Sequence, residues 1–174
     1  AAIPGAGMTA LRMLRQGNVQ GGQQVMIYGA SGAVGTYAVQ LAKYFGAAVT
    51  GVCSGENVAL VKELGADAVI DYTKGEFGAG EQRYDTIFDA VGKLTPELAK
   101  KLLKDPGMYV DVHKVRGGEN RDDLIFLRDR VEAGQLKPVI DRCYTLEQLV
   151  EAHRYVDTGH KKGNVSITVA REGA

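Results

Sequence analysis

Short uncharged apolar runs alternate along this chain with longer segments whose apolar residues recur every three or four positions. The uncharged runs are expected to be buried strands at residues 25–28, 48–52, 68–70, 86–88 and 108–110. Helical periodicity is expected at residues 5–17, 33–45, 57–64, 95–104, 120–133 and 145–156. An alternating run at residues 165–169 is expected to be a last strand. The pattern predicts an α/β domain, a doubly wound parallel sheet with helices on both faces.

Two of the expected helices begin with recognisable capping signals. Thr95 is placed as an N-cap, with Pro96 at the first helical position. Thr145 and Gln148 have the spacing of a capping box. Both signals support the predicted helix starts.

A glycine-rich turn follows the first expected strand and opens the next helix. Gly29, Gly32 and Gly35 recur every third residue, and Ala30 stands where the usual G-x-G-x-x-G pattern has its first glycine. Gly32 is placed to let a diphosphate approach backbone N–H groups at the helix N-terminus, and Gly35 to let helix and strand pack closely. The motif predicts the phosphate corner of a Rossmann-type fold. A glycine turn that binds nothing is the alternative.

Composition narrows the classes of partner. The 174 residues are 45% hydrophobic and 24% charged, with 21 basic and 21 acidic side chains. We expect one domain over residues 1–174, with no nucleic-acid partner and no membrane contact. Cys53 and Cys143 are too few for a disulfide framework, which favours a cytoplasmic location. The chain begins without Met or a signal-peptide pattern, so we expect a fragment or processed product.

Six sequence blocks, in order, resemble the medium-chain dehydrogenase/reductase superfamily, and most of all its quinone oxidoreductase and zinc-type alcohol dehydrogenase-like branch. The blocks are IPGAGMTAL (3–11), GASGAVGTYAVQLAKYFGA (29–47), LGADAVIDY (64–72), YDTIFDAVG (84–92), EAGQLKPVID (132–141) and EAHRYVDTGHKKGNVSI (151–167). The resemblance covers only the cofactor-binding domain. It implies that strand 165–169 normally belongs to a missing catalytic domain, so we expect it to be mobile or paired with another copy.

The resemblance implies nine cofactor-binding positions. They are Thr9, Ser31, Gly32, Ala33, Val34, Ser54, Tyr72, Val91 and Val112. Residues 31–34 would line the diphosphate mostly through backbone atoms, and Thr9 would lie near the nicotinamide amide. For Thr9 the alternative is a hydroxyl bonded to its own helix, and for Val91 and Val112 it is core packing. Residues 161–164 match a loop near the cofactor phosphates in relatives, but exposed loop charge is the favoured interpretation.

The end of the second strand bears on the choice between NADP and NAD. No acid follows Cys53 that could bind a ribose 2′-hydroxyl and repel a 2′-phosphate, while Ser54 and Tyr72 offer hydroxyl donors. NADP is therefore favoured. Relatives that prefer NADP usually carry Arg or Lys just beyond this point, whereas this chain has Glu56 and Asn57, so NAD remains the alternative.

Neither a metal site nor a catalytic residue emerges from the sequence. In zinc-dependent relatives a Cys supplies a ligand where this chain has Gly5, and its cysteines and histidines lack metal-ligand spacing, so we expect no zinc. The cysteines are expected to be a core thiol and a strand or loop thiol, and the histidines surface imidazoles. The strand-end acids are expected to cap turns rather than to catalyse; they are Asp71, Asp85, Asp89 and Asp111.

After Val112 about 25 residues of the relatives' pattern, close to one strand-and-helix step, are expected to be absent. That region builds the dimer edge in relatives, so a homo-oligomer stays open. The leading hypothesis is an NADP(H)-binding domain of a zinc-independent oxidoreductase that acts on a small carbonyl or quinone substrate, and that turns over little by itself. A non-catalytic nucleotide-sensing or scaffold module is the alternative. Short-chain dehydrogenases are excluded, because Ala33 breaks their glycine pattern and no Tyr has Lys four positions later.

Overall fold

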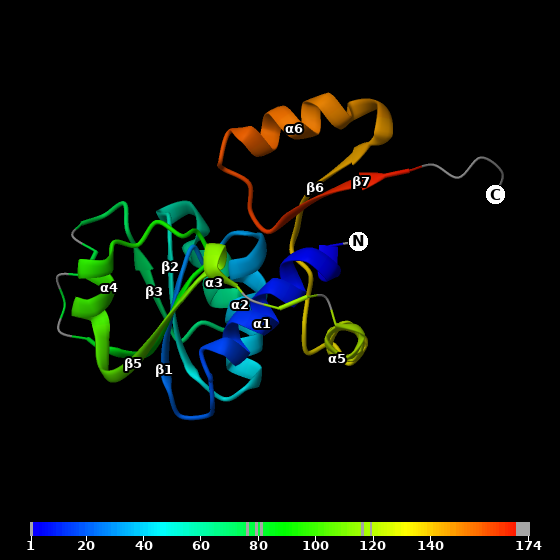
Figure 1. Cartoon of the computed structure of the whole chain (residues 1–174). Coiled ribbons are helices and arrows are strands. Elements are labelled where there is room, and N and C mark those ends of the chain that lie inside the picture. Colours follow the sequence, from blue (N-terminus) through cyan, green and yellow to red (C-terminus); the bar gives the residue numbers. More distant parts are fainter. Residues whose placement is uncertain are drawn as a thin grey trace.

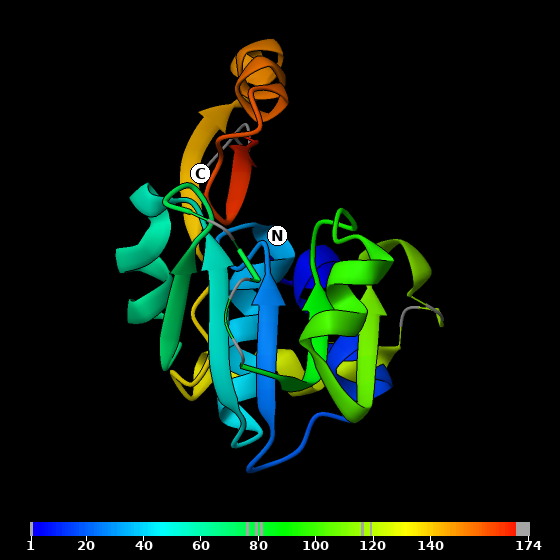
Figure 2. The same ribbon diagram turned by 90° about the vertical axis from the view of Figure 1, so that its left-hand side faces the viewer.

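A five-stranded parallel sheet forms the centre of the protein (Figures 1 and 2). The computed structural model describes residues 2–75, 77, 78, 80, 82–115, 117, 118 and 120–169. The strands are β1 (Gln24–Tyr28), β2 (Ala48–Cys53), β3 (Ala68–Asp71), β4 (Tyr84–Asp89) and β5 (Leu103–Asp111). Their order is β3-β2-β1-β4-β5, and every neighbouring pair is parallel. The five expected strands and the Rossmann-type sheet are confirmed, and the strand order reverses beside β1.

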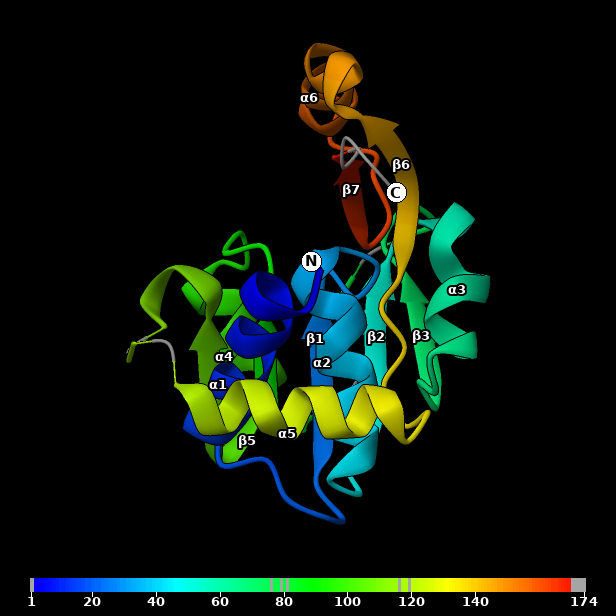
Figure 3. The same cartoon turned by 90° about the vertical axis from the view of Figure 1, so that its right-hand side faces the viewer.

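Helices cover both faces of this sheet, as predicted. One face carries the π-helical turn η1 (Ile3–Gly7), α1 (Met8–Gln16), α2 (Ala33–Tyr44), the short η2 (Gly55–Asn57) with α3 (Val58–Glu63), and α5 (Arg121–Glu132). The other face carries α4 (Pro96–Leu102) (Figures 1 and 3). β1 contributes to the hydrophobic cores on both faces of the sheet, because Val25 and Ile27 pack into one core cluster and Met26 into the other. This burial on two faces explains its uncharged sequence.

One predicted helix end is wrong. The helix expected to reach residue 104 ends at Leu102, because Leu103 has an extended backbone (φ −80°, ψ 145°) and begins β5. The predicted cap is present, since the Thr95 side chain accepts a hydrogen bond from Leu98 N. β5 therefore starts five residues before Met108, where the apolar run had placed it.

The C-terminal part forms a small βαβ unit that projects from the sheet (Figure 1). It comprises β6 (Ile140–Thr145), η4 (Leu146–Gln148), α6 (Leu149–Asp157) and β7 (Asn164–Thr168). The predicted capping box of Thr145 and Gln148 is present. β6 and β7 pair in parallel, so the expectation that strand 165–169 lacks a partner within the chain is wrong. β6 escaped prediction because its two charged residues, Asp141 and Arg142, interrupt the apolar pattern.

β5 is an edge of the five-stranded sheet. The turn η3 (Val112–Lys114) follows it, and Asn120 caps α5 by accepting a hydrogen bond from Asp122 N. In the part of the chain that the structure describes, no further strand joins β5. None of the helices described is long and apolar enough to cross a membrane.

Candidate cofactor-binding site

The glycine turn lies at the carboxyl end of β1 and is fixed to its neighbours by backbone hydrogen bonds. Gly29 N and Ala30 N both donate to Val52 O at 3.0 Å, and Gly32 N donates to Gly29 O at 3.1 Å. A Cβ added at Gly35 would overlap Gly29 O and lie 2.8 Å from Ala30 Cα. Gly35 thus allows the close helix–strand contact predicted for it.

The N-terminus of α2 opens directly from this turn. The first hydrogen bond of the helix runs from Thr36 N to Gly32 O, so the helix does not use the N–H groups of Ala33, Val34 and Gly35. These donors and the positive end of a 12-residue helix favour an anion at this corner. The corner has the chemistry that a diphosphate requires.

A pocket of about 570 Å³ lies beside the turn. Its volume suits a cofactor-sized ligand. It brings together five of the nine predicted positions, namely Ser31, Gly32, Ser54, Tyr72 and Val91. Segments far apart in the sequence therefore meet at the carboxyl edge of the sheet, where open α/β folds bind ligands.

The remaining four predicted positions lie outside the lining of this pocket. Ala33 and Val34 begin α2 next to Gly32. The Thr9 hydroxyl donates to Gly5 O at 2.9 Å, which matches the alternative of a bond to its own helix. Val112 packs partly buried against the core beside the sheet. The assignment of these residues to the cofactor stays a prediction.

The β2–β3 end of the pocket is polar. Ser54 Oγ accepts a hydrogen bond from Asn57 Nδ2 at 2.9 Å, and Tyr72 is 49% exposed. Asp71 lies behind this surface, where its Oδ1 accepts from Thr73 N and Thr73 Oγ1. The bond from the Thr73 hydroxyl lowers the pKa of Asp71. Asp71 therefore caps a turn, as predicted.

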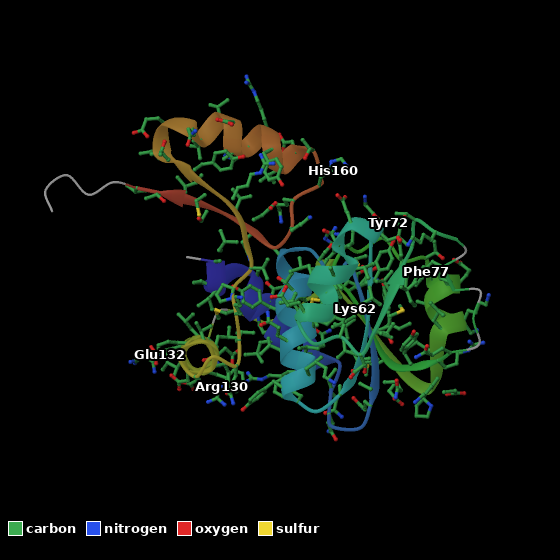
Figure 4. All side chains as sticks on the ribbon, turned by 180° about the vertical axis from the view of Figure 1, so that it is seen from behind. Lys62, Tyr72, Phe77, Arg130, Glu132 and His160 are labelled. Carbon is green, nitrogen blue, oxygen red and sulfur yellow. The ribbon has the colours of Figure 1, made fainter. Side chains whose placement is uncertain are left out.

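A loop from the C-terminal unit closes one side of the pocket. Gly163 N donates to Ser31 O at 2.8 Å, and Lys161 Nζ donates to Gly163 O at 2.9 Å. Lys161 and His160 line the pocket, and Figure 4 shows His160 on the loop above Tyr72. Burial lowers the pKa of Lys161. The favoured interpretation of this segment as exposed loop charge is wrong for Lys161, which is half-buried.

Lys161 and Lys93 are pocket residues that the sequence interpretation did not assign to the site. Lys93 follows β4 in the turn that also carries Val91. The signal for Lys161 was the match of residues 161–164 to a loop near the cofactor phosphates in relatives, which was set aside in favour of exposed loop charge, and no local signal marked Lys93. Their placement depends on how three loops pack together in the folded chain: the glycine turn after β1, the turn after β4 and the loop before β7.

The two thiols lie where they were expected. Cys53 is buried at the end of β2, and burial raises its pKa to about 11. Cys143 is exposed on β6, and the three histidines are exposed. Within the described ranges no three His, Cys, Asp or Glu side chains are grouped as metal ligands would be.

The strand order, the glycine turn and the pocket at the switch point define a dinucleotide-binding domain of the Rossmann type. A family model described as zinc-binding dehydrogenase matches residues 33–130, and a second with the same description matches residues 111–166. The chain belongs to this family, within the medium-chain dehydrogenase/reductase superfamily, and corresponds to its cofactor-binding domain.

Similar proteins include plant reductases and a bacterial oxidoreductase. A 2-methylene-furan-3-one reductase of Solanum lycopersicum is 34% identical over 96% of this chain and 46% of its own length. An NADPH-dependent alkenal/one oxidoreductase of Arabidopsis thaliana, named as chloroplastic, is 32% identical over the same shares. The structure of the quinone oxidoreductase from Coxiella burnetii matches with a TM-score of 0.90 and 32% identity, over 98% of this chain and 60% of that one. The chain spans about half the length of the curated relatives it matches.

Proposed function

We propose that this chain binds NADP(H) as the cofactor domain of a zinc-independent oxidoreductase that reduces quinones, enones or similar activated carbonyls. The observation that carries the proposal is the pocket in which the glycine turn, the N-terminus of α2 and the β2 end converge. The names of similar proteins support it, because they include an NADPH-dependent alkenal/one oxidoreductase and a quinone oxidoreductase.

The chain's part in this chemistry is to bind and orient. The N–H groups of Ala33 and Val34 would hold the diphosphate, while Ser54 and Tyr72 would contact the adenosine half. When bound, the nicotinamide supplies the hydride from its C4 atom. No side chain described here is assigned as an acid or base, so substrate turnover is proposed to need the catalytic domain.

NADP(H) is proposed over NAD(H) because of the charges around the pocket. No acid ends β2, and Lys161 brings to the same pocket a cation that the sequence after β2 lacks. Glu56, which also lines the pocket, is exposed and would oppose a 2′-phosphate. We propose that Lys161 together with the hydroxyls of Ser54 and Tyr72 outweighs it, because charge-assisted hydrogen bonds are the stronger kind.

Titration with the two cofactors tests this proposal. We expect NADPH to bind this chain at least about tenfold more tightly than NADH, and Lys161→Ala to remove most of that difference, because one charge-assisted bond contributes about 1.5–3 kcal/mol. Lys162→Ala is the matched control, because Lys162 is the next residue in the chain and does not line the pocket. Absence of binding for both cofactors, or tighter binding of NADH, would contradict the proposal.

A non-catalytic nucleotide-sensing module is the competing function, and activity separates the two. The protein in its full length, assayed with NADPH and a panel of quinones and enones, should oxidise NADPH only if it is a reductase. Metal analysis of the same preparation tests zinc independence, which Gly5 supports by standing where the resemblance expects a cysteine. A cytoplasmic location is also proposed, and cell fractionation tests it. A homo-oligomer stays open, and light scattering decides it.

A further inference from the structure

Asp89 is a fully buried carboxylate at the carboxyl end of β4. Its exposed fraction is 0%, and both oxygens accept two hydrogen bonds each. Oδ1 accepts from Val91 N at 2.9 Å and Gly92 N at 2.7 Å. Oδ2 accepts from Leu94 N and from the Tyr109 hydroxyl, each at 2.9 Å. A buried charge is tolerated only when it is hydrogen-bonded in this way.

These hydrogen bonds fix the turn after β4. The backbone N–H groups of Val91 and Gly92 both donate to Oδ1, and Leu94 N donates to Oδ2. Tyr109 ties the same carboxylate to β5. Burial and the adjacent Asp89 raise the pKa of Tyr109, so its hydroxyl stays a donor. Four hydrogen bonds to one carboxylate therefore hold the turn in place.

The fixed turn forms one wall of the cofactor pocket. Val91 is 37% exposed, lines the pocket, and packs against Gly29, where an added Cβ would overlap the Val91 side chain. The carboxylate behind Val91 thus sets how closely this wall approaches the glycine turn. Because a displaced turn would move Val91, the carboxylate can act on a ligand that it does not touch.

A dinucleotide lies across the switch point, with one half over each side of the sheet. The β2–β3 side holds Ser54 and Tyr72, so the β4–β5 side, where Val91 stands, faces the nicotinamide half. We propose that Asp89 is a positioning residue for the nicotinamide half of the cofactor, acting through the wall that Val91 forms. This inference rests on the proposed function, since it requires that the pocket holds NADP(H).

The test compares NADPH with 2′,5′-ADP, which lacks the nicotinamide half. For Asp89→Asn, which loses acceptor capacity at one oxygen, we expect the Kd for NADPH to rise at least about tenfold and the Kd for 2′,5′-ADP to change less than about twofold. The increase in nicotinamide fluorescence when NADPH binds should also be smaller in Asp89→Asn than in the wild type. A merely structural role would not produce this change. Asp85→Asn is the matched control, because Asp85 accepts from Gln24 N at the opposite end of β4.

A second variant keeps the inference testable if Asp89→Asn does not fold. Val91→Ala removes the wall and leaves the carboxylate in place, and it should also weaken NADPH selectively, by about threefold. Equal weakening of both ligands, or no weakening in either variant, would overturn the positioning role. A wild-type chain that binds neither ligand would instead contradict the proposed function, so the two failures are distinguishable.

Discussion

Replacing Gly35 by alanine should lower the stability of the fold by an amount that the structure allows us to work out. The new Cβ would overlap Gly29 O and lie 2.8 Å and 2.9 Å from Ala30 Cα and C. All three atoms belong to a backbone that two hydrogen bonds hold to Val52 O, so no rotamer change relieves the contact. Overpacking of this kind costs ~1–3 kcal/mol, and the higher helix propensity of alanine offsets up to ~1 kcal/mol.

We therefore expect a net loss of about 1–2 kcal/mol in the free energy of unfolding, which corresponds to a fall in Tm of about 2–8 °C for a chain of this size. Urea unfolding followed by circular dichroism measures the first quantity and a thermal scan the second. Gly5→Ala is the control, because among the described residues no atom outside its chain neighbours and its own helical turn lies within 4 Å of the position that its Cβ would take.

Gly32→Ala is the companion variant, and it should separate binding from stability. Among the described residues beyond its chain neighbours, its Cβ would meet Gly29 O alone, at an ordinary distance of 3.4 Å, so we expect the free energy of unfolding to change by less than ~1 kcal/mol. NADPH should nevertheless bind at least about tenfold more weakly, because the Cβ would stand in front of the α2 N-terminus. Wild-type stability in Gly35→Ala would refute the close-contact argument, and wild-type NADPH affinity in Gly32→Ala would refute the assignment of the phosphate corner.

Three further predictions concern the scaffold. Hydrogen bonds from the Lys43 ammonium and from a backbone N–H lower the pKa of Asp67. The stability that the ionised Asp67 contributes to the fold should therefore be present above the unfolded-state pKa of ~3.9 and be lost as the pH falls below it. In a plot of the urea unfolding midpoint against pH, Asp67→Asn should flatten the fall at acid pH. Thr95→Ala removes the cap of α4 and should cost ~0.5–1 kcal/mol in urea unfolding, whereas Thr95→Ser should not. Gln40 exchanges two side-chain hydrogen bonds with the backbone of Lys137, at 3.0 Å and 2.8 Å, so Gln40→Ala should speed amide exchange at Lys137 about tenfold, and an unchanged rate would contradict the role of this link.

The sequence predicted the five central strands because each contains a short uncharged apolar run, and three of them, β1, β2 and β4, are largely buried within the sheet. The cap at Thr95 and the capping box at Thr145 are local signals, and both are present. β6 could not be recognised in the same way, since it belongs to a half-exposed two-stranded sheet and its partner is β7, beyond α6. The end of α4 was misplaced because nothing in the local residues distinguishes a last helical turn from the first residues of β5.

In the candidate site, too, the sequence predicted the residues that local signals mark and missed those that tertiary packing brings in. The phosphate corner is continuous in sequence, and Ser31 and Gly32 line the pocket as predicted. Lys161 reaches it from 130 positions beyond Ser31, so its role depends on the docking of the C-terminal unit. Asp89 was correctly expected to cap a turn, but only the structure shows that this turn is a wall of the pocket.

The hydrogen bond from Gly163 N to Ser31 O occupies a backbone acceptor of the glycine turn and leaves its nearby backbone donors available. The acceptor at Ser31 is satisfied from the C-terminal unit, while the donors at the start of α2 remain oriented for an anion. If that unit tilted away, the bared oxygen would present its negative dipole beside a bound diphosphate and repel it. We therefore expect anion affinity and the seating of β6, α6 and β7 to rise and fall together, and slower amide exchange at Gly163 in the presence of NADPH would report this linkage.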